Sequence, residues 1–320
     1  MRETLITIIE NIPLIATLVL ANYVLAAVCA VREVAASRTS QGSIAWLVAL
    51  AFLPFPTAFV YLVFGWKHFD SYAKTRLEVR GTRLIRSEEL AVIDRETGKE
   101  WPVQLRAAGM PFTAGNKAEL LVDGDAAFES IFEGIAEAER YVFVQFYIIR
   151  HDSLGQRLAA ALMERARAGV AVYVLYDDVG SGGLSQEYKE RLRAEGIQIF
   201  AFNNRHRFLR FFGPMRINYR NHRKNVVVDG RIGWTGGINV GVEYLGQDKR
   251  FGHWRDTQLR LEGPAVSSLS LIFQEDWLWA TGEVLNAERP PIEEPGTTPA
   301  LLMATGPADR FEACAIAFSD

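Results

Sequence analysis

The sequence is short of the residues that hold small secreted domains or metal centres together. Its 320 residues include 2 Cys, Cys29 and Cys314, which lie too far apart to indicate a disulfide framework or a zinc site. It also lacks a carboxylate cluster of the kind that binds Mg²⁺. Hydrophobic residues make up 49% of the chain and charged residues 23%, so a folded core is expected rather than disorder. The net charge of −3 does not by itself predict a polyanionic partner.

Charge is missing altogether from two long stretches. Neither Asn11 to Val31 nor Thr39 to Trp66 contains a charged residue, and each is long enough to cross a hydrocarbon core of about 30 Å as a helix. A signal peptide is disfavoured because Arg32 follows where a cleavage site is expected, and a buried helical hairpin is the remaining alternative. We predict a transmembrane hairpin over residues 1–66, with helices at about 11–31 and 42–66 and a kink at Pro54 and Pro56.

The charges that flank these stretches predict the orientation of the hairpin. The segment 67–86 carries six Lys or Arg residues, whereas the short connection between the two apolar runs carries Arg32 and Arg38. Basic segments stay on the cytoplasmic side of a membrane. We therefore expect both ends of the hairpin, and everything after residue 67, to face the cytoplasm.

Strands and helices alternate after a charged juxtamembrane connector at 67–115. AELLVDG (118–124), YVFVQFYII (141–149), VAVYVLY (170–176) and IQIFAF (197–202) are typical of strands, and amphipathic helices separate them. Asp125 is expected to cap the first helix, whose apolar positions are Phe128, Ile131, Phe132 and Ile135. The pattern predicts an α/β domain at 116–281 with a mixed or mostly parallel sheet flanked by helices. A Pro- and Glu-rich linker is predicted at 282–299.

The chemistry is concentrated in NHRKNVVVDGRIGWTGGIN, residues 221–239. Val226 to Val228 predict a buried strand, and on a strand His222 and Lys224 would face the same side. An imidazole can attack phosphorus and form a covalent intermediate, while an ammonium group beside it holds a phosphate oxygen. Gly236 and Gly237 would let the backbone approach a ligand, and the Asn239 amide would bind a second oxygen. Such a site suits a phosphodiester and predicts neither a metal nor a cofactor.

These residues also resemble a known family. His222, Lys224 and Asp229, followed by Gly236-Gly237-x-Asn239, resemble the HKD motif of the phospholipase D superfamily. VQFYIIRHD (144–152), TGGINVGVEY (235–244) and WRDTQLRLEGPAV (254–266) are similar to bacterial cardiolipin synthases, as is the second apolar run.

The resemblance implies a phosphatidyltransferase in the bacterial inner membrane that joins two phosphatidylglycerols into cardiolipin and releases glycerol. It makes His222 the nucleophile that forms a phosphatidyl-histidine. Lys224 and Asn239 bind the phosphate, and Asp229 supports the site.

Two departures from the family pattern stand out. The superfamily uses two HKD motifs, yet no His follows His253, and residues 300–320 look like the truncated start of a second half. Gln258 stands where the family has His. We therefore expect the single-motif chain to make little or no cardiolipin alone and to be prone to self-association.

A basic stretch at 205–224 contains interleaved aromatic residues. Contact with anionic lipid is preferred here to nucleic-acid binding or a solvated loop, since a hairpin precedes it. The residues expected to contact the headgroup or the membrane are Arg210, Arg216, Arg220 and Asn221. Asp177 and Asp178 end a strand, where they could orient groups in the site or cap a helix.

Two alternatives to the synthase remain open. One is a phospholipase D-like phosphodiesterase or nuclease that works as a two-fold dimer, and the other is a non-catalytic remnant that keeps the fold. The apolar hairpin favours the lipid enzyme over the nuclease, so no nucleic-acid partner is expected. The absent second motif favours the remnant over full activity.

Overall fold

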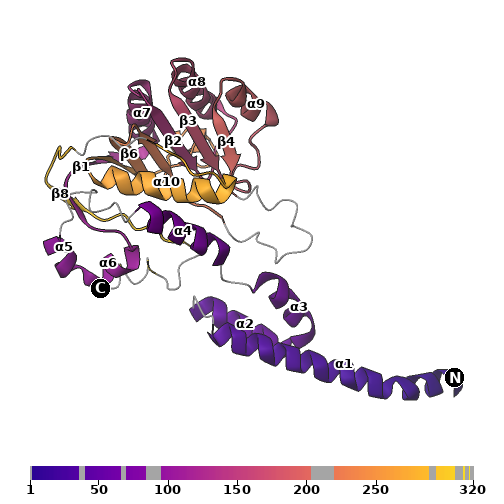
Figure 1. Ribbon diagram of the computed structural model, residues 1–320. Coiled ribbons are helices and arrows are strands. Elements are labelled where there is room, and N and C mark those ends of the chain that lie inside the picture. Colours follow the sequence, from indigo (N-terminus) through magenta and orange to yellow (C-terminus); the bar gives the residue numbers. More distant parts are fainter. Residues whose placement is uncertain are drawn as a thin grey trace. The chain divides into compact units, whose positions relative to one another are not determined.

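The computed structural model describes residues 2–35, 40–65, 70–83, 95–202, 220–287, 293–306, 313 and 317. The described chain divides into two compact units, helices α1 to α3 and everything from α4 onward. The elements are drawn in Figure 1. The domain boundaries at 66, 115, 281 and 299 stay predictions.

The first unit consists of apolar helices. α1 (Arg2–Ala35) contains Ile12–Ala35, the described segment that is long and apolar enough to cross a membrane. The second apolar run is not one helix. It forms α2 (Ser40–Phe52) and α3 (Pro54–Phe64), which Leu53 separates. Proline cannot donate a helical hydrogen bond, so the predicted break is found where the prolines lie. Ala26 and Cys29 of α1 pack against Leu50, Ala58 and Tyr61 of the other two helices.

The second unit is built on a mixed sheet, as predicted. Within the described residues the sheet has eight strands in the order β4-β3-β2-β5-β6-β7-β1-β8. β2, β3 and β4 run parallel, and the other neighbours pair antiparallel. The strands are β1 (Thr113–Val122), β2 (Tyr141–Phe146), β3 (Ala171–Tyr176), β4 (Gln198–Ala201), β5 (Asn225–Val228), β6 (Ile232–Gly236), β7 (Thr257–Glu262) and β8 (Thr298–Ala300).

Helices cover both faces of this sheet (Figure 1). α7 (Asp123–Ala136), α8 (Ser153–Arg167) and α9 (Gln186–Ala194) pack on one face, with Phe128, Ile131, Phe132 and Ile135 all in the core as predicted. α7 begins at Asp123, two residues before the predicted cap, so Asp125 lies in its first turn instead of capping it. The helices are completed by α5 (Arg95–Glu100), α6 (Pro102–Ala108) and the short 3₁₀ helix η3 (Val242–Leu245).

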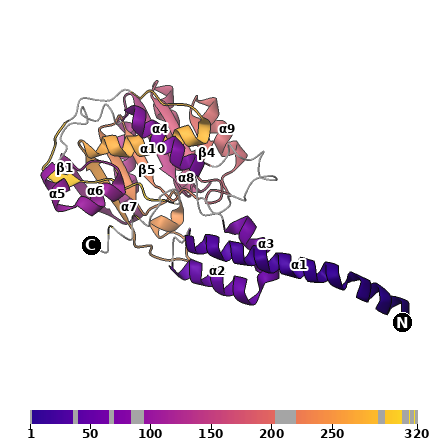
Figure 2. The same ribbon diagram turned by 60° about the horizontal axis from the view of Figure 1, so that its bottom comes forward.

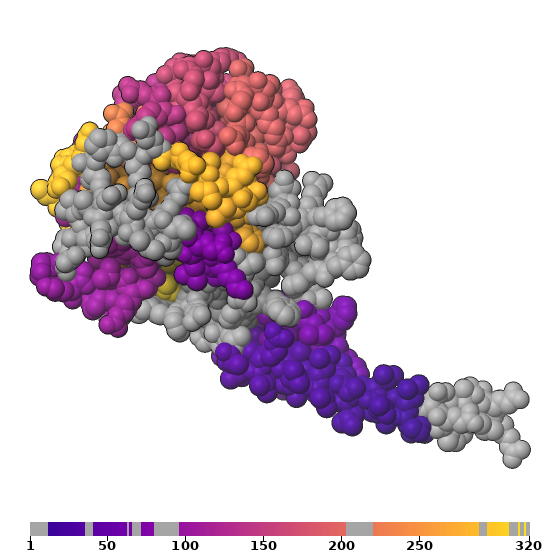
Figure 3. Space-filling view, viewed as in Figure 1, coloured from indigo at the N-terminus to yellow at the C-terminus, as the bar shows by residue number. Residues whose placement is uncertain are grey.

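The other face carries α10 (Ala265–Thr281), which packs Phe273 and Trp277 against Phe143 and Val227. α4 (Asp70–Arg83) lies along α10, as Figures 1 and 2 show in ribbon form and Figure 3 shows at the surface. Val79 of α4 packs against Leu271 and Ile272 of α10. A helix that follows the apolar segments in sequence is therefore part of the α/β unit.

Candidate active site

The site is built on the segment that leads into β5, a buried strand between β2 and β6. His222 and Lys224 precede this strand, which starts at Asn225, so their predicted place within it is wrong by a few residues. Side chains nevertheless alternate from residue 221 onward. Asn221, Arg223 and Asn225 reach toward α10, where they bind Asp276 and the Leu269 carbonyl. His222 and Lys224 meet instead at the ring of Tyr147.

Tyr147 is a functional candidate that the sequence analysis missed. The His222 imidazole stacks on its ring, with centroids 3.9 Å apart and planes 18° from parallel. Lys224 Nζ lies 5.6 Å from the same ring centroid and donates a hydrogen bond to the His222 carbonyl at 2.6 Å. Ser181 Oγ donates to the Tyr147 carbonyl at 3.1 Å and so fixes the backbone beneath the ring. The available signal was its place just after β2, whose end lies beside the start of β5.

The surroundings of His222 favour a neutral imidazole. Desolvation lowers the pKa of His222, and the cations Lys224 and Arg220 lower it further against the opposing effect of Asp177. A neutral imidazole carries the lone pair that nucleophilic attack needs. Burial also lowers the pKa of Lys224, while the Asp256 carboxylate works against this and favours the ammonium form. The pair therefore combines a neutral imidazole, which is able to act as a nucleophile, with a cation.

Gly236 and Gly237 lie against the protein's own chain, and their predicted contact with a phosphate stays a prediction. A Cβ at Gly236 would lie 2.4 Å from the Thr257 carbonyl oxygen, and one at Gly237 would lie 2.1 Å from Asp256 Oδ1. The Gly237 N–H is taken by the Thr257 carbonyl at 3.0 Å. The glycines thus admit the start of β7, which brings Asp256 toward Lys224. Beside them Gln258 is buried, and neither polar atom of its amide has a hydrogen-bond partner among the described residues.

Asn239 is buried and already engaged by the protein. Its Oδ1 accepts the Ile148 N–H at 3.0 Å and its Nδ2 donates to the Tyr244 hydroxyl at 2.7 Å. These bonds tie the chain after β2 to η3. A side-chain amide has two N–H groups, so one remains for a phosphate oxygen by count. The phosphate-binding role of Asn239 stays a prediction.

Asp229 does not lie beside His222 and Lys224. It lies at the opposite end of β5 from His222 and Lys224, buried, with a left-handed φ of 52°. Its carboxylate accepts three backbone N–H groups, those of Glu139, Arg140 and Tyr141, at 2.8–2.9 Å. None of these contacts reaches His222 or Lys224, and the role of Asp229 in orienting or supporting the site stays a prediction. Asp229 fixes the turn between α7 and β2, whose backbone N–H groups would otherwise be unpaired.

The expected headgroup contacts divide into three kinds. Asn221 is buried and is a structural residue, because its backbone N–H binds Asp177 Oδ2 at 2.9 Å and its amide binds Asp276. Asp177 thus orients residues 221–224, here called the motif segment, which is one of the two roles left open for Asp177. Arg220 is exposed and donates to the Tyr147 hydroxyl at 3.4 Å, so it lies beside His222 and Lys224. Arg210 and Arg216 lie outside the described residues.

His253 and the possibility of a metal site remain to be described. His253 Nε2 lies 2.9 Å from Asp123 Oδ2, at the start of α7, with its ring exposed. Among the described residues, no group of three or more His, Cys, Asp or Glu side chains could hold a metal ion. The arrangement that remains is an imidazole, an ammonium and an aromatic ring.

Comparison with known sequences places this arrangement in a family. Residues 131–277 match the family described as the phospholipase D-like domain of cardiolipin synthase. Residues 23–66 match the N-terminal segment described for phospholipase D nucleases. The chain belongs to the phospholipase D superfamily. Its α/β unit is a phospholipase D-like domain of the cardiolipin synthase type, and the predicted resemblance is confirmed.

Curated relatives extend over nearly the whole chain. Cardiolipin synthase A from Pseudomonas aeruginosa is 42% identical over 305 residues, which cover 92% of this chain and 62% of that protein. Cardiolipin synthase A from Pseudomonas fluorescens is 39% identical over 320 residues, covering 95% and 65%. The chain therefore spans less than two thirds of the length of these relatives.

Among solved structures, NucT from Helicobacter pylori covers 52% of this chain and 98% of its own, with 16% identity and a TM-score of 0.39. Phosphatidylserine synthase from Haemophilus influenzae covers 53% and 39%, with 18% identity and a TM-score of 0.40. Similarities this low carry no argument about substrate.

The stacked ring predicts the protonation behaviour of His222. Tyr147→Ala admits water to the imidazole, so the pKa of His222 should rise toward its ordinary value, whereas Tyr147→Phe keeps the ring and should leave it low. Because the folded pKa lies below the unfolded one, this His makes stability rise with pH up to the unfolded pKa, and the Ala variant should weaken that slope. NMR titration of ¹³C-labelled histidine, assigned with His222→Gln, measures the shift. An unchanged pKa in Tyr147→Ala would show that the ring does not desolvate His222.

The position of Asp229 predicts a loss of stability without a loss of site geometry. Asp229→Ala leaves three backbone donors unpaired and puts Ala at a positive φ, so it should cost about 2–4 kcal/mol in chemical denaturation. Asp229→Asn keeps one acceptor oxygen and tolerates this φ, and should cost less. The His222 titration should not move in either variant. A shifted His222 pKa in a folded variant would return Asp229 to the site.

Proposed function

We propose that the chain supplies the nucleophile of a phosphatidyltransferase of the cardiolipin synthase type, with phosphatidylglycerol as its substrate, and that it makes little or no cardiolipin alone. The observation that carries the proposal is the His222 and Lys224 pair on the Tyr147 ring. The surroundings favour the neutral, nucleophilic imidazole, and the ammonium group beside it suits an anionic phosphodiester. The 42% identity to cardiolipin synthase A supports the choice of reaction.

The proposed reaction has two displacement steps. A His222 ring nitrogen attacks the phosphorus of phosphatidylglycerol, an N–P bond forms, and the P–O bond to glycerol breaks. Glycerol leaves with a proton. The free hydroxyl of a second phosphatidylglycerol then attacks, gives up its proton, and releases the imidazole with formation of cardiolipin. One proton is consumed and one released, so the cycle needs no net acid or base.

Each charged residue near His222 has a place in this scheme. Lys224 would face the negative charge that grows on the phosphoryl oxygens, where a preorganised cation lowers the barrier most. Arg220, exposed beside Tyr147, would meet an anionic headgroup at the rim. Asn239 would add its remaining amide N–H.

We further propose that the protein is embedded in the bacterial inner membrane with its α/β unit in the cytoplasm. The apolar surface of α1 supports embedding, since Leu14, Leu18 and Leu20 are largely exposed. Two crossings require α2 and α3 to span together, joined at the proline break. The basic residues after the second run support the orientation. Self-association stays a prediction.

The nucleophile is tested with a substrate whose leaving group needs no acid. Phosphatidyl-p-nitrophenol should give a burst of nitrophenolate and a phosphatidyl group on the peptide that contains His222, measured by absorbance and mass spectrometry. His222→Ala should abolish both, and Lys224→Met should slow the burst about 100-fold or more.

The matched control for this experiment is His151→Ala, because His151 is exposed and lies against Tyr188 at an edge. This variant should keep the burst. A burst that survives in His222→Ala would refute the covalent mechanism.

The orientation is tested by cysteine labelling in intact cells. In a background with Cys29 and Cys314 replaced by Ser, Lys74→Cys on the exposed side of α4 should resist an impermeant maleimide until the cells are lysed. Arg38→Cys, in the connection between the apolar runs, is the control that should be labelled without lysis. The reverse labelling pattern would place the α/β unit outside the cytoplasm.

A further inference from the structure

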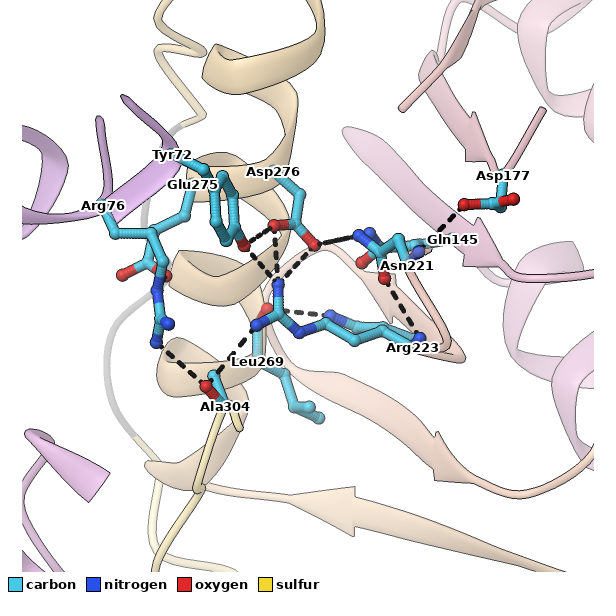
Figure 4. Close-up of polar contacts among 11 residues, drawn as sticks. Tyr72, Arg76, Gln145, Asp177, Asn221, Arg223, Leu269, Glu275, Asp276 and Ala304 are labelled. Atoms are coloured by element: carbon cyan, nitrogen blue, oxygen red, sulfur yellow. Dashed lines mark hydrogen bonds and ion pairs between the residues drawn. The ribbon is translucent and has the colours of Figure 1, made fainter. Parts of the chain in front are cut away.

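A single buried carboxylate lies at the centre of the polar contacts behind the motif segment (Figure 4). Asp276 of α10 is fully buried, and four side chains donate to it. Gln145 of β2 binds it at 2.7 Å, and Asn221 of the motif segment at 2.7 Å. Arg223 binds both of its oxygens at 2.6 Å, and the Tyr72 hydroxyl of α4 is the fourth donor. An ionised carboxylate has about four acceptor positions, so this one is saturated.

Two of these donors flank the nucleophile. Asn221 and Arg223 stand immediately before and after His222, and both are bound to Asp276. The side-chain oxygen of Asn221, Oδ1, also accepts a hydrogen bond from the backbone N–H of Arg223 at 3.0 Å. This bond closes the turn between the two residues. With its two neighbours fixed on one side, the His222 side chain must leave the backbone on the other. That direction leads to Tyr147.

The charge of Asp276 matters to this arrangement as well as its shape. Burial acts to raise the pKa of Asp276, but the Arg223 guanidinium and the hydrogen bonds from Arg223, Tyr72 and Gln145 together hold the pKa below its usual value. The carboxylate is therefore ionised, and Arg223 is held by a charged contact, in which its Nη1 lies 2.6 Å from both carboxylate oxygens, rather than by a neutral bond. Buried ion pairs often add little stability compared with apolar packing, and their best-supported use is to fix one arrangement among several.

The same cluster extends to α4. The Tyr72 hydroxyl also accepts from Arg223 Nη1 at 2.7 Å, so α4 touches both members of the ion pair. One turn further, Arg76 binds Glu275 at 3.0 Å and the Ala304 carbonyl at 3.0 Å. Glu275 and Asp276 are thus adjacent, buried carboxylates of α10 that both bind α4. Asp276 also binds the motif segment.

We propose that Asp276 is a positioning residue, which fixes His222 and Lys224 through its contacts with Asn221 and Arg223. Tyr72 of α4 contributes to the same positioning, because it binds both Asp276 and Arg223. The proposal rests on the proposed role of His222 as nucleophile. It predicts that a change on α4, which contacts neither His222 nor Lys224 in the described contacts, alters the chemistry at His222.

The test compares Asp276→Asn and Tyr72→Phe with the matched control Glu275→Gln in the full chain in detergent. Asp276→Asn should slow the nitrophenolate burst about 100-fold, the usual effect of a misplaced reacting group, and change the half-saturating substrate concentration little. Tyr72→Phe should give a smaller loss of the same kind. Glu275→Gln breaks the Arg76 pair and should lower the denaturation midpoint while keeping the burst.

The NMR signal of ¹³C-labelled His222 provides a readout that does not depend on turnover. It should shift in Asp276→Asn and Tyr72→Phe and stay in place in Glu275→Gln. If Asp276→Asn does not fold, Tyr72→Phe decides. An unmoved His222 signal and an unchanged burst in Tyr72→Phe, or a loss in Glu275→Gln equal to that in Asp276→Asn, would overturn the proposal. If the wild-type chain shows no burst, the proposed function fails, and the NMR comparison still decides the positioning role.

Discussion

The structure of the site depends on the alternation of side chains along residues 221–228. One set of side chains is bound to α10, through Asp276 and the Leu269 carbonyl, and buries Val227 against it. The opposite set starts with His222 and Lys224 and continues into Val226 and Val228, which are packed under α7 and α8. A slip of one residue would exchange the two sets and bury the reactive pair. The ion pair of Arg223 with Asp276 makes such a slip costly, because both charges would lose their partners.

Much of the fold follows from local patterns in the sequence. The run Val226 to Val228 predicts a buried strand, and the 3–4 spacing from Phe128 to Ile135 predicts the buried face of α7; both are confirmed. The start of α7 is less accessible to local reasoning. Asp123 enters the helix with a φ of 65° because its N–H is bound to the carbonyl of Asp256, more than 130 residues away. Nothing adjacent to Asp125 in the sequence reports that contact.

The site was predicted where its chemistry is local and missed where it depends on packing. The spacing of His222 and Lys224 is enough to bring them together, even though both lie just before the strand. The roles of Asp229, Gly236 and Gly237 depend on which backbone approaches them, and that is set by the α7–β2 turn and by β7. Asp276 left one sequence signal, a buried Gln-Glu-Asp run within the apolar helix α10. A polar run at such a place needs buried partners, which is a reason to look for them.

Three cations lie close to His222 in the sequence and would repel one another. The buried Asp276 carboxylate reduces this repulsion. Arg220, Arg223 and Lys224 are all within two residues of the imidazole, and like charges this close repel. Arg223 is removed from this group because Asp276 neutralises it on the far side of the segment. Lys224 and Arg220 remain on the side of Tyr147, where desolvation first and then these two cations lower the pKa of the imidazole, and where their positive charge suits the proposed phosphodiester. The buried carboxylate therefore contributes to the charge of the site as well as to its shape, although it lies on the opposite side of the backbone.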